Sequence, residues 1–132
     1  MQMSKMSRKK TLCKHDWSKI KILLENNMFQ EVIEEIDIID SLTDLWYIID
    51  ANLGLGKLDK AEELLNIWKY QISNPMSESY WIFYEALIKI QKNQLEEAKL
   101  ALEEALEIAK REDAEKIAKK ILSYLKRIEK PR

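Results

Sequence analysis

WSKIKILLENNMFQEV spans residues 17–32, and the same arrangement returns in WYIIDANLGLGKLDKA at 46–61 and FYEALIKIQKNQLEEA at 83–98. Each copy has apolar residues at its first, fourth and eighth positions, Asn or Gly at the eleventh, Phe or Leu at the thirteenth, and Val or Ala at the sixteenth. Apolar residues three and four apart share one helix face, and Asn or Gly suits the left-handed turn that ends a helix. The copies begin 29 and then 37 residues apart. A period of about 33 residues is typical of stacked helical hairpins, so each copy predicts two helices and a tight turn.

The composition favours one folded domain built from helices. Of the 132 residues, 46% are apolar and 34% are charged, and there are only two Gly and two Pro. These values are typical of a folded soluble protein and leave little room for β-hairpins. No apolar run approaches the roughly 18 residues that suggest a membrane span, and the basic N-terminus lacks the apolar segment of a signal peptide. The single cysteine, Cys13, cannot form an internal disulfide, so we expect a cytoplasmic protein.

The net charge of −1 conceals an uneven distribution of charge along the chain. Residues 1–14 contain no acid, and we expect them to form a disordered basic arm ahead of a single domain over residues 15–132. The bases of this arm are Lys5, Arg8, Lys9, Lys10 and Lys14. Residues 22–56 contain no base, and their acidic residues are Glu25, Glu31, Glu34, Glu35, Asp37, Asp40, Asp44 and Asp50.

Seven helices follow from the apolar periodicity. They are predicted at 16–26 and 29–40, at 44–54 and 58–72, at 78–92 and 95–110, and at 113–129. The helix over 78–92 is apolar on most sides, so we expect it to be the most buried. The helix over 113–129 has one apolar stripe and is expected to cover the third hairpin.

Polar residues, glycine and proline predict where the helices begin and end. The expected N-caps are Asp16, Ser41 or Thr43, Ser77 and Asp113. Both Gly54 and Gly56 are expected to supply left-handed backbone in the second turn. Asn74–Pro75 is expected to end the helix before it, because the residue preceding a proline avoids helical backbone.

The turn motif and the small residue that follows it resemble those of the tetratricopeptide repeat, over about residues 14–129. The resemblance rests on Asn27, Gly56 and Asn93 in the turns and on Val32, Ala61 and Ala98 after them. It implies an all-α, TPR-like array of three helical hairpins plus a C-terminal solvating helix. It also implies that a peptide, a helix or a protein binds in a groove lined by the first helix of each hairpin.

Two sets of residues could line that groove, depending on which face of each first helix points into it. We call the two alternatives registers. The large aromatic residue lies one position closer to the small residue than in the common repeat, and one position rotates a helix face by about 100°. In the common register, the groove is lined by Trp17, Lys21, Trp46, Asp50, Phe83, Leu87 and Ile90. In the shifted register, Trp17, Trp46 and Phe83 are core residues, and Tyr47, Trp81 and Tyr84 face the groove. Carboxylate-clamp repeats grip acidic C-terminal peptides with a Lys and an Asn four residues apart, and the matching pairs here, Trp17/Lys21, Trp46/Asp50 and Phe83/Leu87, lack that combination.

The acidic stretch provides a second candidate surface. Its exposed helix face is predicted to carry Glu31, Glu34, Glu35 and Asp37. Such a face favours a basic partner by speeding encounter, while a simple solvated helix face is the alternative.

The sequence contains little that indicates catalysis, a metal or a cofactor. His15 is the only histidine, and Cys13 with His15 cannot supply the four ligands of a zinc site. There is no phosphate-binding glycine loop and no nucleophile motif. We therefore expect no catalytic residues, no metal and no cofactor.

The sequence thus predicts a non-catalytic protein–protein interaction scaffold or adaptor whose partner is another protein or peptide, with a basic partner favoured. The alternative is a small regulatory or nucleic-acid-associated factor that uses the basic arm. The acidic stretch argues against RNA in the groove, because contact with phosphate requires Lys or Arg.

Overall fold

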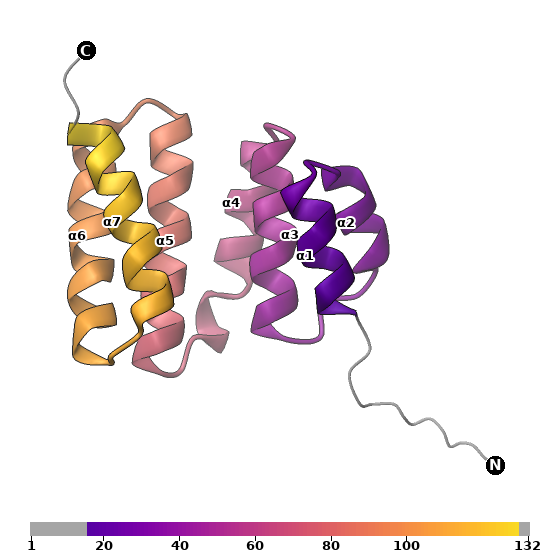
Figure 1. The fold of residues 1–132 in the computed structure, drawn as a ribbon, viewed down its shortest axis with the longest axis horizontal. Helices are drawn as coiled ribbons and strands as arrows, with labels where there is room; N and C mark the ends of the chain where they lie inside the picture. The colour runs from indigo at the N-terminus through magenta and orange to yellow at the C-terminus, as the bar shows by residue number, and fades with distance from the viewer. Residues whose placement is uncertain (1–15, 130–132) are drawn as a thin grey trace. The chain divides into compact units, whose positions relative to one another are not determined.

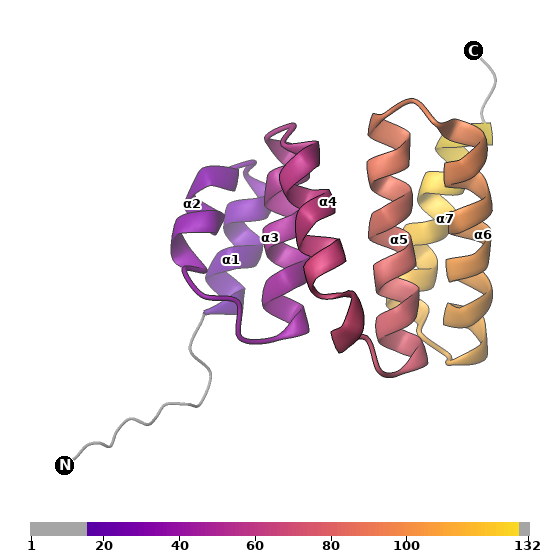
Figure 2. The ribbon, with the colours of Figure 1, turned by 180° about the vertical axis from the view of Figure 1, so that it is seen from behind.

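The computed structural model describes residues 16–129, and within them the chain is all-α (Figures 1 and 2). Its elements are α1 (Trp17–Glu25), α2 (Phe29–Glu35), α3 (Leu42–Gly54), α4 (Leu58–Ile67), the 3₁₀ turn η2 (Lys69–Gln71), α5 (Pro75–Gln91), α6 (Leu95–Arg111) and α7 (Glu115–Glu129). The chain divides into two compact units at Leu55 and Gly56. We refer to residues 16–55 as unit 1 and to residues 56–129 as unit 2. That residues 15–132 act as one domain stays a prediction. None of the described helices combines the length and the apolar character that crossing a membrane requires.

Unit 1 is a group of three helices in which α1, α2 and α3 pack against one another. Ile20 and Val32 are completely buried there. A polar contact also joins α1 to α3, because the indole Nε1–H of Trp17 donates to Oδ1 of Asp44 at 3.1 Å. The other carboxylate oxygen of Asp44 accepts the backbone N–H of Asp40 at 3.0 Å. This buried carboxylate therefore holds together the beginning of α3 and the side of α1.

The second helix of the first hairpin is shorter than predicted. It was expected to reach residue 40 but ends at Glu35, with Ile36 as its C-cap. Three isoleucines and two aspartates fill residues 36–40, and both residue types favour helix weakly. Asp40 and Ser41 instead serve the beginning of α3, where the hydroxyl oxygen of Ser41 accepts the N–H of Asp44. Ser41 is thus the N-cap, one of the two candidates for this position.

Unit 2 is built around α5. This helix packs along α6, contacts α4, and is also touched by α7, which lies mainly along α6. Leu102, Ile117 and Ile121 are almost completely buried between these helices. The hydroxyl of Ser79 on α5 donates to the carbonyl oxygen of Ala105 on α6 at 2.8 Å. α7 thus covers the third hairpin, as the sequence predicted.

Four turns within residues 16–129 each contain a residue with left-handed backbone conformation. Positive φ angles occur at Asn27 (58°), Gly56 (75°) and Asn93 (62°), which confirms the predicted turn positions. Asp113 (54°) was expected to be an N-cap but has the same conformation, so the motif appears once more before α7. Three of these turns share a pair of backbone hydrogen bonds. At the third turn, for example, the N–H of Asn93 donates to the carbonyl oxygen of Ile90 at 2.9 Å, and the N–H of Gln94 donates to that of Lys89 at 2.8 Å.

The two glycines have different roles. Gly56 has left-handed backbone, but Gly54 is the last residue of α3 and does not. A Cβ atom at Gly54 would overlap the ring of Phe29 on α2. Gly54 is therefore required for close packing between α2 and α3, which corrects the expectation that both glycines supply left-handed backbone.

The connection between α4 and α5 also differs from the prediction. α4 ends at Ile67 rather than at 72, and the 3₁₀ turn η2 follows. Asn74 is the N-cap of α5, its side chain accepts the N–H of Ser77 at 2.9 Å, and Pro75 is the first helical residue. Ser77 is therefore not the cap. Proline suits this first position because its missing N–H would have no partner within the helix.

α5 was predicted to be the most buried helix, but α3 is buried at least as much. α5 contains seven buried residues among 17, while α3 contains seven among only 13. The first helix of the third hairpin is therefore not more buried than the first helix of the second hairpin.

Candidate functional site

A groove lies on unit 2 where the α4–α5 connection meets α5 and α6. Its volume is about 600 Å³. Its walls are Lys69 of η2, Ile72, Ser73 and Asn74 of the connection, Pro75, Glu78, Trp81, Ile82 and Glu85 of α5, and Glu104 of α6. Figure 2 shows how η2 and its connection lead from the end of α4 to the start of α5. We call this site the α5 groove.

One face of α5 supplies the middle of the α5 groove. Glu78, Trp81, Ile82 and Glu85 occupy positions three, four and seven apart, so they share one side of the helix. Trp81 and Ile82 are apolar and lie between the two glutamates. The α5 groove therefore has an apolar centre with a carboxylate on either side along the helix.

Three glutamates line the α5 groove: Glu78, Glu85 and Glu104. Among residues 16–129, no ion pair or hydrogen bond engages the side chain of Glu78, Glu85 or Glu104. Other surface glutamates are paired, as in the contact of Lys92 with Glu62 at 3.0 Å. Lys69 is the one basic residue among the described residues that line the groove. The local charge is therefore negative.

Trp81 is held in place at the border of this groove. Its Nε1–H donates to the carbonyl oxygen of Leu65 on α4 at 3.0 Å, and the side chain is half-buried. A smaller hollow of about 280 Å³ lies on its other side, where the Lys92–Glu62 pair forms part of the wall. The indole is thus a fixed apolar surface rather than a freely rotating one.

Large apolar side chains are exposed at the end of α4, in η2 and at the start of α5. Tyr70 is 87% exposed, Ile67 59% and Met76 46%. Each is a sequence neighbour of the segment that lines the groove. Exposed apolar side chains gathered in one segment are a feature of binding surfaces.

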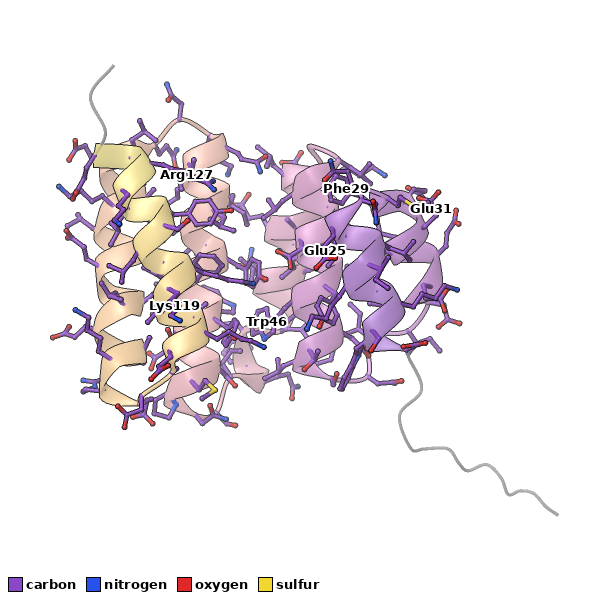
Figure 3. The ribbon with its side chains drawn as sticks, viewed as in Figure 1. Glu25, Phe29, Glu31, Trp46, Lys119 and Arg127 are labelled. Carbon is purple, nitrogen blue, oxygen red and sulfur yellow. The ribbon has the colours of Figure 1, made fainter. Side chains whose placement is uncertain are left out.

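The predicted groove residues do not follow a single register. Trp17 is partly exposed and Lys21 is exposed, while Trp46, Tyr47 and Asp50 are half-buried. Trp46 is labelled in Figure 3. In unit 2, Phe83, Tyr84 and Leu87 are buried, because α6 and α7 cover that side of α5. Trp81 is the only predicted site residue that lines the α5 groove. The common register thus places Phe83 wrongly, and the shifted register places Tyr84 wrongly.

The buried aromatics of α5 belong to the core of unit 2. The Phe83 ring lies edge-on to Tyr84, with centroids 5.1 Å apart, and to Tyr124 of α7, at 5.7 Å. Arg127, labelled on α7 in Figure 3, lies over the Tyr124 ring at 4.7 Å. On α5, burial also raises the pKa of the Tyr80 hydroxyl. These contacts account for the aromatic residues through packing.

The acidic surface of unit 1 is smaller than the sequence suggests. Glu31 and Glu34 are exposed on α2, and Glu31 is labelled in Figure 3. Glu35 is paired with Lys19 of α1 at 3.1 Å, although no base lies near it in the sequence. Asp37 lies beyond the end of α2 and is exposed. The four carboxylates therefore do not form one continuous helix face.

Sequence reasoning missed most of the α5 groove. No binding role was predicted for Glu78, Glu85 or Glu104, and Ile72 was the last residue of the helix predicted over 58–72. The spacing of Glu78, Trp81, Ile82 and Glu85 was a usable signal in the sequence. The contribution of α6 through Glu104 was not, because it depends on how α5 and α6 pack.

No group of three His, Cys, Asp or Glu side chains within the described residues could hold a metal ion. The basic arm at residues 1–14 lies outside the described residues. Comparison with protein-family models, with curated proteins and with solved structures finds no match for this chain. The function is therefore argued from the site itself.

Proposed function

We propose that this chain is a non-catalytic protein–protein interaction module and that the α5 groove is its binding site. The observation that carries the proposal is the combination of an apolar centre, formed by half-buried Trp81 over the buried Ile82, with three carboxylates that have no ion-pair partner among residues 16–129. An apolar anchor site with a polar rim is the usual anatomy of a protein interface.

The chemistry of the lining residues supports binding rather than turnover. The apolar wall is formed by side chains that orient a partner by shape, and its tryptophan is immobilised by the contact with Leu65. Tryptophan in such a position is typical of the few residues that dominate binding energy. Tyr70 and Met76, which are exposed, each follow directly in sequence a residue that lines the groove.

The test is capture of partners from the native host by the full chain, followed by mass spectrometry. A chain with Glu104→Lys is compared with one carrying Glu103→Lys. Both glutamates are exposed neighbours on α6, but only Glu104 lines the α5 groove. Helical content and thermal stability are measured for both variants.

We expect a partner that is retained by the wild-type chain and by Glu103→Lys but lost with Glu104→Lys. Equal retention of every partner by both folded variants would place the binding surface elsewhere. Capture of nucleic acid in place of protein, with a steep loss of affinity as salt rises, would favour the basic arm.

A further inference from the structure

The charges of the α5 groove have a defined spacing. Glu78 and Glu85 lie seven residues apart on α5, which is about 10.5 Å along a helix. Trp81 and Ile82 lie between them, and Glu104 adds a third carboxylate from α6. A partner must therefore present cations at a matching distance with apolar side chains between them.

A helix meets these requirements better than an extended segment. The residues that line the groove belong to helices and their connection, and residues 16–129 contain no strand whose edge could pair with an extended backbone. An extended peptide would depend on sparse side-chain contacts for its backbone groups, whereas a helix satisfies its own N–H and C=O groups. In a helix, residues seven apart repeat the 10.5 Å spacing, at about 1.5 Å per residue.

We infer, on the premise of the proposed function, that the α5 groove recognises a helix that carries cations and apolar side chains on the same face. Its Lys or Arg residues are seven apart and face Glu78 and Glu85, and its apolar residues, three and four positions after the first cation, pack against Trp81. Glu104, on α6, also favours a positive charge on the partner. The carboxylates set the sign of the partner's charge and speed encounter, while the apolar centre supplies contact area.

The probe is a fluorescein-labelled synthetic peptide, KAALLAAKAALLAAK, which has lysine at every seventh position and leucine pairs between. Two control peptides accompany it. AAKLLAAAAKLLKAA has the same composition but places its lysines on the opposite helix face. EAALLAAEAALLAAE reverses the charge. Binding of each peptide to the full chain is followed by fluorescence anisotropy at low and at physiological salt.

The receptor variants form a matched pair. Glu78→Gln/Glu85→Gln removes both charges of the α5 groove. Glu96→Gln/Glu103→Gln removes two exposed charges that are also seven apart, but on α6 and outside the groove. Each substitution keeps the shape of the side chain, and helical content is checked for both variants.

We expect the first peptide to bind the wild-type chain, and the groove variant to weaken its Kd by about tenfold, a change of about 1.4 kcal/mol. The α6 variant should leave the Kd within about twofold, and both control peptides should bind at least about tenfold more weakly. Raising the salt concentration should weaken binding to the wild-type chain more than to the groove variant.

Two outcomes would overturn the inference. One is that the first peptide and its rearranged control bind equally well. The other is that the first peptide fails to bind or is insensitive to Glu78→Gln/Glu85→Gln. Neither outcome removes the proposed function, which is decided by the comparison of Glu104→Lys with Glu103→Lys in partner capture.

Discussion

Gly54 shows how one absent side chain determines a helix contact. Alanine normally stabilises a helix relative to glycine by up to about 1 kcal/mol. At Gly54 the added methyl group would overlap the Phe29 ring, so steric repulsion outweighs that gain. We expect Gly54→Ala to destabilise the chain by about 1–3 kcal/mol in urea denaturation. In a Phe29→Leu background the loss should be smaller, and an equal loss in both backgrounds would contradict this explanation.

Gly56 is the matched control, because there the backbone conformation, and not a neighbouring side chain, limits which residue fits. A Cβ atom there would meet nothing within 4 Å, but φ is +75°. Gly56→Ala should cost about 1–2 kcal/mol, independently of Phe29. Gly56→Asn should cost less, because Asn27 and Asn93 already adopt this conformation in the corresponding turns. The same urea series measures all of these variants, and a penalty for Asn as large as that for Ala would argue against a purely backbone effect.

The raised pKa of Tyr80 predicts how the stability of the chain changes at alkaline pH. Burial raises the pKa of its hydroxyl above 10.0, so the folded state keeps the proton more strongly than the unfolded state. The associated stability is fully present below about pH 10, the pKa of an unfolded tyrosine, and is lost as pH rises through the higher folded pKa. We expect the free energy of unfolding to fall less between about pH 9 and pH 11 in Tyr80→Phe than in the wild type. Tyr70→Phe, at an 87% exposed position, is the control and should reproduce the wild-type slope.

At the scale of elements, the beginning of α5 depends on Asn74. Its side chain accepts the N–H of Ser77, and Pro75 occupies the first helical position. We expect Asn74→Ala to lower the free energy of unfolding by about 1 kcal/mol. Ser77→Ala should change it by less than about 0.5 kcal/mol, because this side chain does not cap the helix. A larger loss from Ser77→Ala than from Asn74→Ala would support the N-cap that the sequence predicted. Urea denaturation distinguishes the two results.

The packing of α7 concerns unit 2 as a whole, because this helix contacts both α6 and α5. Ile121 is completely buried, while its neighbour Leu122 is 42% exposed. Ile121→Asp would bury an unpaired charge and should cost about 3 kcal/mol or more. Leu122→Asp should cost less than about 1 kcal/mol, and thermal denaturation compares the two. Similar melting temperatures for both variants would mean that α7 does not pack on the third hairpin in solution.

Most elements could be predicted because their signals are local. The turn residues Asn27, Gly56 and Asn93 were identified from spacing alone, since left-handed backbone limits the choice of residue. The errors arose where two local signals compete. Asn74–Pro75 can end one helix or begin the next, and the tertiary position of α5 selects the second. The isoleucine-rich segment 36–40, which was predicted to continue α2, has helical periodicity, but its weak helix preference and its role in capping α3 oppose a helix there.

The sequence by itself determined the all-α class, the left-handed turns at Asn27, Gly56 and Asn93, and the small residues Val32, Ala61 and Ala98, which are completely buried. These follow from helix periodicity and from steric limits on the backbone, both of which act over a few residues. Only the tertiary structure decided that Phe83 and Tyr84 are core residues, that Lys19 neutralises Glu35, and that Glu104 joins the α5 groove. Each of these depends on which faces of two helices meet. A rotation of about 100° per residue makes that choice sensitive to single-residue shifts in the packing.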